Sequence, residues 1–344
     1  MTAARTVDVL IVSLGSTEGL RAADAELAQS LCRAGASATV VQATPPRGMR
    51  TVALTDLGWA RACRRAARAE LDRRTPRAVI YSSTTAALLW PRPGAIRFDA
   101  TSQGNRRGRH GLWQRPLERR RLRQAPQLLP WSERGLLEAP PAARRGNRTL
   151  VLPVPVESSG PMPGSARDIA AITYAANPSK KGLDRVLEAW RAVRADRPGD
   201  EADELLIAGA SAEELQGAGF LVPGEEGIRV VGALCAEEYR GLVRRARVFV
   251  CAPRREDYGI AQLEALADGA QLVTTPAPGP YAALPIAREL DARLVSEDLR
   301  SALRAALEDP LTDYSTRAQE SLRPFSRQAA DRVVAEQLLP RLLS

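Results

Sequence analysis

The sequence has almost no lysine or histidine. Lysine and arginine together number 49 in 344 residues, but only Lys180 and Lys181 are lysine, and His110 is the only histidine. Four cysteines stand singly, far apart and without a Cys-x-x-Cys pair. With so few ligands, the sequence argues against a zinc site, and we expect reduced thiols of the kind found in cytoplasmic proteins.

Long hydrophobic runs are also missing. No stretch reaches the roughly 18 apolar residues that a membrane-spanning helix needs, although 44% of the residues are hydrophobic. The apolar run at 7–14 ends in a glycine turn without a small-residue cleavage site, so we interpret it as a buried first strand and not as a signal peptide. These features predict a cytoplasmic protein.

Three common nucleotide and hydrolase motifs are absent. The chain has no Gly-x4-Gly-Lys-Ser/Thr element, which argues against a P-loop ATPase. It has no Gly-x-Ser-x-Gly elbow for a serine hydrolase. The loop "SLGSTEG" at 13–19 follows an apolar run but lacks the Gly-x-Gly-x-x-Gly pattern of a dinucleotide-binding dehydrogenase.

Positive charge is in excess and concentrated in one segment. The net charge is +9, and much of the excess lies in "NRRGRHGLWQRPLERRRLR" at 105–123. No helix-turn-helix, RNP or zinc-finger signature accompanies it, which argues against nucleic acid as the main partner. An anionic membrane surface, an acidic substrate or simply a solvated arginine-rich face fits the same pattern.

Short apolar runs of strand length, such as those at 38–42 and 149–156, alternate along the chain with amphipathic stretches, such as the helix expected at 113–124. This alternation predicts an α/β fold with parallel sheets. A segment rich in serine, glycine and proline at 157–166 interrupts the alternation, which then restarts, and we interpret this segment as an interdomain linker. We therefore expect an N-terminal domain over 1–160, a second domain over 161–325, and a C-terminal helix over 326–344 that packs back across the cleft. Ligands of such sheets bind beyond the carboxyl ends of the strands.

The segment "PRREDYGIAQLEALADGAQLVTT" at 253–275 carries the sharpest motif. A strand is expected to end near 252, and a helix to open at Gly259. Glu256 precedes this helix and Glu264 lies within it, eight positions later, so both carboxylates can point into one cleft. The amides at the start of the helix can bind a phosphate, and Gly259 allows a ligand to approach the backbone closely.

This segment resembles the signature of GT-B glycosyltransferases similar to glycosyltransferase family 4. The resemblance covers roughly 169–310 and implies two Rossmann-like lobes whose parallel sheets face a central cleft. It implies that Glu256 bonds the hydroxyls of a donor sugar and that Glu264 bonds the ribose. It also implies that the sugar and phosphates face the backbone around four residues: Tyr258, Gly259, Ile260 and Ala261.

"AANPSKKGLDR" at 175–185 resembles the lysine-glycine element that meets the donor diphosphate in the same family. Lys181 occupies the position of the family's lysine, with Lys180 beside it. The arginine usually found a few residues upstream is absent, and Lys180 is a candidate to compensate for it. Lysine is a compact point charge on a flexible stem, unlike the planar arginine that the chain uses elsewhere.

The first half resembles the family less closely. Gly15 and Ser16, in the loop at 13–19, correspond to the glycine-containing loop that faces the diphosphate and acceptor. Asp99 and His110 stand where the family often has polar residues on the acceptor side, so we take both as catalytic candidates, together with Lys181 and Glu256.

The resemblance implies a retaining, metal-independent glycosyltransferase of the hexosyltransferase type. Its donor would be a UDP- or GDP-linked sugar bound as substrate, with no separate cofactor and no metal. The acceptor is not identified, and peripheral contact with the anionic inner face of the membrane is compatible with the basic segment. Two alternatives stay open: another GT-B enzyme, such as a nucleotide-sugar epimerase, or a basic protein that binds membrane surfaces or nucleic acid.

Overall fold

The computed structural model describes residues 5–46, 51–106, 108–161, 164, 167–196 and 203–344. The chain divides into two compact units. The first consists of 1–155 and 325–344, and the second of 156–324. The division therefore falls five residues before the expected position, and the C-terminal segment belongs to the first unit.

The first unit contains a parallel five-stranded sheet in the order β2-β1-β3-β4-β5. Its N-terminal elements are β1 (Arg5–Ser13), α1 (Glu18–Arg33), β2 (Ala38–Gln42), α2 (Val52–Arg73), β3 (Arg74–Tyr81), α3 (Thr84–Ala87) and β4 (Ala95–Phe98). They are followed by α4 (Ser102–Asn105), η1 (Gly108–Gly111), α5 (Gln114–Gln124), β5 (Leu128–Pro130), α6 (Glu133–Glu138) and η2 (Pro141–Ala143).

Helices cover both faces of this sheet, which explains why its strands read as continuous apolar runs. Leu10 and Val12 of β1 point into a core shared with α2, α3 and α5. Val9 and Ile11, which alternate with them, point into the opposite core with α1. Neighbouring residues of a strand face opposite sides of the sheet, so one run of four apolar residues, 9–12, serves two cores.

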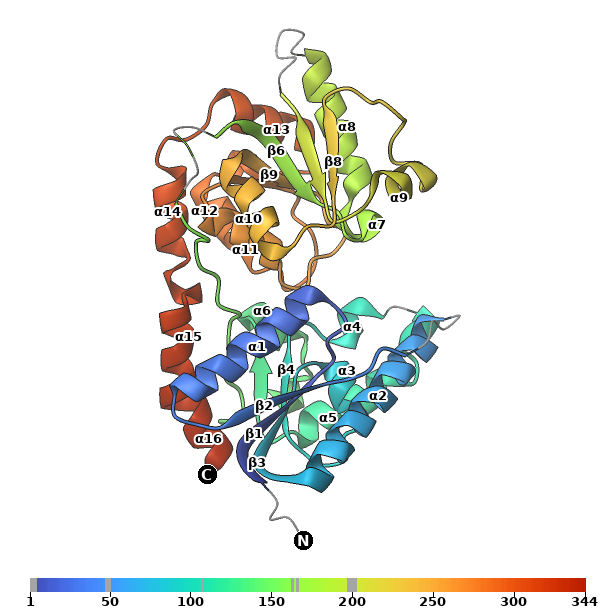
Figure 1. Cartoon of the computed structure of the whole chain (residues 1–344), viewed down its shortest axis with the longest axis vertical. Helices are drawn as coiled ribbons and strands as arrows, with labels where there is room; N and C mark the ends of the chain where they lie inside the picture. Colours follow the sequence, from blue (N-terminus) through green and yellow to red (C-terminus); the bar gives the residue numbers. More distant parts are fainter. Residues whose placement is uncertain (1–4, 47–50, 107, 162–163, 165–166, 197–202) are drawn as a thin grey trace. The chain divides into compact units, whose positions relative to one another are not determined.

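The C-terminal segment completes the second of these cores. It forms α15 (Arg327–Val333), a π-helical turn η5 (Val334–Leu338) and α16 (Leu339–Leu343), which lie beside α1 in Figure 1. Val334 and Leu338 are buried against Leu27 of α1. The Asp331 carboxylate accepts from Ser30 at 2.5 Å and pairs with Arg33 at 2.7 Å.

The second unit contains another parallel five-stranded sheet, in the order β10-β9-β6-β7-β8. Its first elements are β6 (Ile169–Tyr174), α7 (Pro178–Lys181), α8 (Leu183–Asp196), β7 (Leu205–Ala208), α9 (Ala212–Gly217), β8 (Ile228–Gly232) and α10 (Ala236–Arg245). The remaining ones are β9 (Ala246–Cys251), α11 (Ile260–Ala267), β10 (Gln271–Thr274), α12 (Ala283–Leu290), η3 (Ala292–Leu294), α13 (Leu299–Glu308) and α14 (Tyr314–Ser321), with η4 (Arg323–Phe325) at the return to the first unit.

The predicted α/β class with two parallel sheets is confirmed. The apolar segment at 149–156 nevertheless forms no strand. It has one bridge, between Leu128 and Thr149, and its Leu150 and Leu152 amides donate to the carbonyls of Leu128 and Pro130. Pro153 and Pro155 lack the amide protons that a ladder requires. Among the described helices, none combines the length and the apolar character needed to cross a bilayer.

Candidate functional site

Two loops of the second unit meet where the strand order of its sheet reverses. β6 lies between β7, the next strand in the chain, and β9, which comes after β7 and β8 in the chain. The loop after β6 leads to α7, and the loop after β9 leads to α11. Because β6 and β9 are parallel neighbours, both loops leave the same edge of the sheet side by side. In open α/β sheets, ligands bind at this kind of switch point.

The lysine pair and the acidic motif contact each other there. Lys181 Nζ lies 2.7 Å from Glu256 Oε2, and Lys180 Nζ lies 3.2 Å from Asp257 Oδ2. The Lys181 side chain is 22% exposed and the Lys180 side chain 48%, so Lys181 forms the more enclosed pair. Arg255 adds a third cation, with its Nε 2.8 Å from Asp257 Oδ1. Sequence positions some 75 residues apart are thus joined in one charged cluster.

Glycine at 182 makes this contact possible. Its φ of +67° ends α7 in the left-handed region. A Cβ built there would lie 1.8 Å from the carbonyl oxygen of Ala252, at the end of β9. The Arg254 amide also donates to the Lys180 carbonyl at 3.1 Å. The lysine turn therefore rests directly on the loop that carries Glu256, with no space for a side chain between them.

The helix that follows this loop begins without a capping side chain. Gly259, at φ +91°, is the N-cap of α11 and makes no side-chain hydrogen bond to the first turn. A Cβ at Gly259 would lie 2.9 Å from the Tyr281 ring. Tyr258 is buried, whereas Ile260 and Ala261 are partly exposed. Amides at such a helix start attract anions.

Glu256 is held from two sides. Its side chain is 6% exposed and accepts from Gln262 Nε2 at 3.1 Å as well as from Lys181. Its own amide donates to the Pro278 carbonyl at 3.1 Å. A Cβ at Gly279 would lie 2.2 Å from the Glu256 carbonyl oxygen, so this second loop also packs tightly against it. The carboxylate is thereby fixed in position before any ligand binds.

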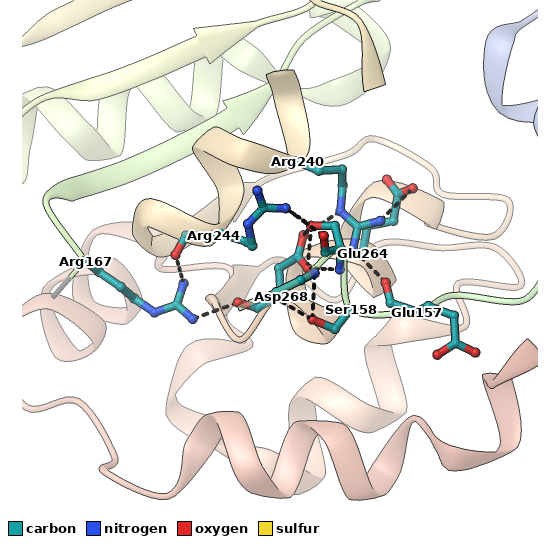
Figure 2. Close-up of polar contacts among 9 residues, drawn as sticks. Glu157, Ser158, Arg167, Arg240, Arg244, Glu264 and Asp268 are labelled. Carbon is teal, nitrogen blue, oxygen red and sulfur yellow. Dashed lines mark hydrogen bonds and ion pairs between the residues drawn. The ribbon is translucent and has the colours of Figure 1, made fainter. Parts of the chain in front are cut away.

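Glu264 lies in a different charged cluster, drawn in Figure 2. Arg240 of α10 places one guanidinium nitrogen 3.4 Å from Glu264 Oε1 and another 2.5 Å from Asp268 Oδ2. Burial raises the pKa of Glu264 above its usual value, and the nearby Arg240 charge opposes that rise. Arg240 therefore favours the ionised form of the glutamate predicted to bind ribose.

The same cluster anchors the start of the segment that we interpreted as a linker. The Asp268 carboxylate accepts from the Ser159 amide at 2.7 Å and from its hydroxyl at 2.9 Å. Arg240 donates to the Glu157 carbonyl at 2.8 Å, and Arg244 donates to the Ser159 carbonyl at 3.1 Å (Figure 2). Residues 157–159 are thus bound to the second unit, while 162–163 and 165–166 lie outside the described residues.

The other predicted residues lie in the first unit. Gly15, at φ +61°, and the exposed Ser16 follow β1. Asp99 follows β4, and its Oδ1 accepts from the Ala100 amide at 2.7 Å. His110 lies in η1, and its side chain is outside the described residues. The charged cluster of the lysine pair is thus built from residues of the second unit, whereas Gly15, Ser16, Asp99 and His110 belong to the first.

Sequence reasoning missed four residues of the second unit, one of which is Arg255, the third cation of the charged cluster. Asp257 is the partner of Lys180, Gln262 is a partner of Glu256, and Arg240 is the partner of Glu264. Asp257 had a visible signal, since it directly follows the predicted Glu256. Arg240 had none, because it lies in another helix and is one of 47 arginines.

Comparison with known proteins finds a family match within the second unit. Residues 167–313 match the family described as glycosyl transferases group 1. The matched segment contains both loops and both charged clusters, apart from the linker residues. No curated protein sequence matches the chain.

Solved structures extend the likeness to nearly the whole chain. WaaG, a glycosyltransferase involved in lipopolysaccharide biosynthesis, has a TM-score of 0.69 at 14% identity, covering 94% of this chain and 99% of its own. HepE from Anabaena, in complex with UDP and glucose, has a TM-score of 0.68 at 13% identity, covering 96% and 99%. A trehalose-6-phosphate structure from E. coli, bound with UDP-2-fluoro glucose, has a TM-score of 0.67 at 11% identity, covering 97% and 99%. Residues 167–313 therefore match the family model of the group 1 glycosyltransferases, and the chain has the GT-B fold of these solved structures.

Proposed function

We propose that this protein transfers a sugar from a UDP- or GDP-linked donor to an acceptor, with retention of anomeric configuration and without a bound metal. One observation carries the proposal: the Lys181–Glu256 pair lies at the β6–β9 switch point, where the lysine-bearing loop meets the loop leading to α11. UDP complexes among proteins of the same fold support a nucleotide-sugar donor.

The charges of this cluster suit a diphosphate. Lys180, Lys181 and Arg255 provide three cations against the carboxylates of Glu256 and Asp257. In the free protein Lys181 is neutralised by Glu256, so a diphosphate must share or replace that contact. Lysine suits such an exchange because its ammonium group sits on a flexible stem and donates in three directions.

The cleavage of the donor bond produces negative charge on the leaving diphosphate, next to the cations of this cluster. The bond between the anomeric carbon and the diphosphate oxygen breaks, and the electron pair leaves with the nucleoside diphosphate. Lys181 and the amides of Tyr258, Gly259, Ile260 and Ala261 stabilise that charge in our proposal. Because they are already in position, little reorganisation accompanies the reaction.

The two glutamates then orient the rest of the donor. Glu256 accepts hydrogen bonds from donor-sugar hydroxyls, and Gln262 keeps its carboxylate aimed. Glu264 accepts from the ribose hydroxyls while Arg240 keeps it ionised. Held in this way, the donor presents its anomeric carbon in one orientation, which is a major source of rate enhancement. Asp99 and His110 stay acceptor-side candidates, to be tested by substitution.

Calorimetry with UDP and GDP tests the proposal directly. We expect one of the nucleotides to bind the full chain and Lys181→Ala to weaken it at least about tenfold, as for a lost charged hydrogen bond. Arg254→Ala is the matched control, because it removes from the facing loop a cation whose side chain donates to the Ser179 carbonyl and to the Asp184 carboxylate. It should leave the affinity unchanged.

Two results would contradict the proposal. If no nucleotide binds the wild type, the donor site is wrong. If Lys181→Ala binds as tightly as the wild type, the phosphate role of Lys181 is wrong. An epimerase would instead convert the donor sugar without any acceptor, which product analysis in the absence of acceptor distinguishes.

Peripheral contact with an anionic membrane is a second, compatible proposal. Arg119, Arg120 and Arg123 of α5 are exposed, and Leu112, just before this helix, is 69% exposed. Exposed cations beside an apolar side chain suit a lipid surface. Such binding should weaken steeply with added salt and should not require Glu256.

A further inference from the structure

The first unit has a cavity at the switch point of its own sheet. In the order β2-β1-β3-β4-β5, the chain moves outward from β1 to β2 and then returns past β1 to β3. A cavity of about 210 Å³ opens at the carboxyl ends of β1 and β3. It is lined by Leu14, Ser16, Val52, Thr55, Asp56, Trp59, Thr85 and Arg106. This is the position in the sheet at which α/β folds bind their ligands.

The polar wall of this cavity is a fixed ion pair. Arg106 Nε lies 2.6 Å from Asp56 Oδ2, and its NH2 lies 3.0 Å from Asp56 Oδ1, so both carboxylate oxygens are engaged. Asp56 is 5% exposed. The Arg106 carbonyl is in turn bonded by Arg115, which fixes the backbone. A two-pronged pair of this kind is rigid, and its two charges cancel.

The apolar wall is formed by an indole ring. Trp59 of α2 and Leu14 are half-buried and pack on the core shared by α2, α3 and α5. Both also line the cavity, so part of each side chain remains open to a ligand. Three hydroxyls complete the lining, those of Ser16, Thr55 and Thr85. Gln114 Nε2 donates to the Thr85 hydroxyl at 3.4 Å, and the Thr55 hydroxyl donates to the Thr51 carbonyl at 3.0 Å.

We propose that this cavity binds one pyranose ring of the acceptor. A pyranose has an apolar face of C–H groups, which suits Trp59, and a rim of hydroxyls, which suits the Asp56–Arg106 pair and the threonines. The volume is below the roughly 300 Å³ of pockets for drug-sized ligands, so it suits a single ring. The inference rests on the proposed glycosyl transfer and assigns the acceptor to carbohydrates.

A free anion fits this cavity less well. Asp56 already neutralises Arg106 through both carboxylate oxygens, and a bound phosphate would lie beside that carboxylate. The lining contains no lysine, since both lysines of the chain belong to the second unit. Removing the Asp56 charge should therefore change the preferred ligand of the cavity from a neutral sugar ring to an anion such as phosphate.

Saturation-transfer NMR on the full chain tests the inference. The probes are the methyl glycosides of glucose, galactose, mannose and N-acetylglucosamine, with inorganic phosphate as the competitor. We expect at least one glycoside to bind and phosphate not to displace it. Trp59→Leu should weaken binding at least about tenfold. Asp56→Asn should also weaken it and make the cavity accept phosphate.

Trp113→Leu is the matched control. Trp113 is another half-buried tryptophan of the first unit and does not line the cavity. This variant should bind glycosides like the wild type. Equal losses in Trp59→Leu and Trp113→Leu would overturn the inference, and so would displacement of the glycoside by phosphate in the wild type.

UDP calorimetry on the same samples separates this inference from the proposed function. Trp59 is not among the predicted nucleotide contacts, which lie in the second unit apart from Gly15 and Ser16, so Trp59→Leu should bind nucleotide normally. Nucleotide binding with no glycoside binding would overturn the acceptor site alone. Glycoside binding with no nucleotide binding would preserve a saccharide site and overturn the donor proposal.

Discussion

Each unit has a parallel sheet of five strands, and in each a candidate binding site lies at the point where the strand order reverses. The side chains at these two points differ in their chemistry. At the β6–β9 switch point, flexible lysines pair with carboxylates and lie near an uncapped helix start. At the β1–β3 switch point, an indole ring and a two-pronged Asp56–Arg106 pair line a small cavity. The first arrangement suits a multiply charged diphosphate, whereas the second suits a neutral ring. A parallel sheet decides where a ligand binds, and the side chains of its loops decide which ligand.

The strand orders explain why each unit has one such place. The first sheet runs 2-1-3-4-5 in its own strand numbers, and the second runs 3-2-1-4-5. Each order reverses direction once, so two neighbouring loops diverge at a single point and leave room between them. Both predicted ligand sites of the protein lie at these points.

The largest expected effect lies at the charged switch point. Lys181→Ala should lower the rate of donor turnover by about a hundredfold to a thousandfold, as for other lost groups that stabilise a leaving charge. Lys180→Ala should cost much less, because its side chain is 48% exposed and its carboxylate partner is also held by Arg255. Hydrolysis of a panel of nucleotide sugars measures both rates without a known acceptor. Equal effects of the two substitutions would remove the distinction between the lysines.

A buried ion pair that does not line the β1–β3 cavity should affect stability and not nucleotide binding. Asp24 and Arg97 are each 1% exposed, with 3.4 Å between their charged atoms. Asp24→Asn leaves Arg97 without its charged partner and should lower the free energy of unfolding by about 3 kcal/mol. Urea unfolding measures this, with UDP affinity as the second measurement.

Asp331→Asn is the matched control for that change. Asp331 pairs with Arg33 in the same unit, but both side chains are more than a quarter exposed. The loss there should stay below about 1 kcal/mol. A larger loss from Asp331→Asn than from Asp24→Asn would contradict the assignment of Asp24 as the structural pair.

The smallest expected effect is a change in the pH dependence of nucleotide binding. Burial raises the pKa of Glu264, so this carboxylate takes up its proton at a higher pH than an ordinary glutamate. A protonated Glu264 accepts ribose hydrogen bonds less well, and UDP affinity should therefore fall as the pH drops through the raised pKa. Arg240→Met removes the charge that opposes the rise, so the loss should begin at a higher pH.

Arg244→Met controls for damage to the surrounding cluster. Arg244 lies one turn further along α10, and its guanidinium donates to the carbonyl and hydroxyl oxygens of Ser159. Calorimetry at several pH values should give this variant the wild-type profile. An unchanged profile in Arg240→Met would show that Arg240 has only a structural role.

The regular elements were largely predictable because local patterns determine them. The strand expected at 38–42 is β2 with the same bounds, and the helix expected at 113–124 is α5 starting one residue later. Apolar runs of strand length and amphipathic stretches are visible without tertiary context. The segment at 149–156 departs from this pattern because its prolines prevent a ladder.

The sequence by itself determined the α/β class, the presence of two similar halves, and the position of the motif containing Glu256 and Glu264. Each of these follows from residues close together in the chain. Only the tertiary structure decided the pairings: Lys181 with Glu256, Arg240 with Glu264, and the meeting of Trp59 with Asp56 and Arg106 at one cavity. These contacts join separate helices and loops, and they depend on strand order and on close approaches such as that of Gly182 to Ala252, which no local pattern encodes.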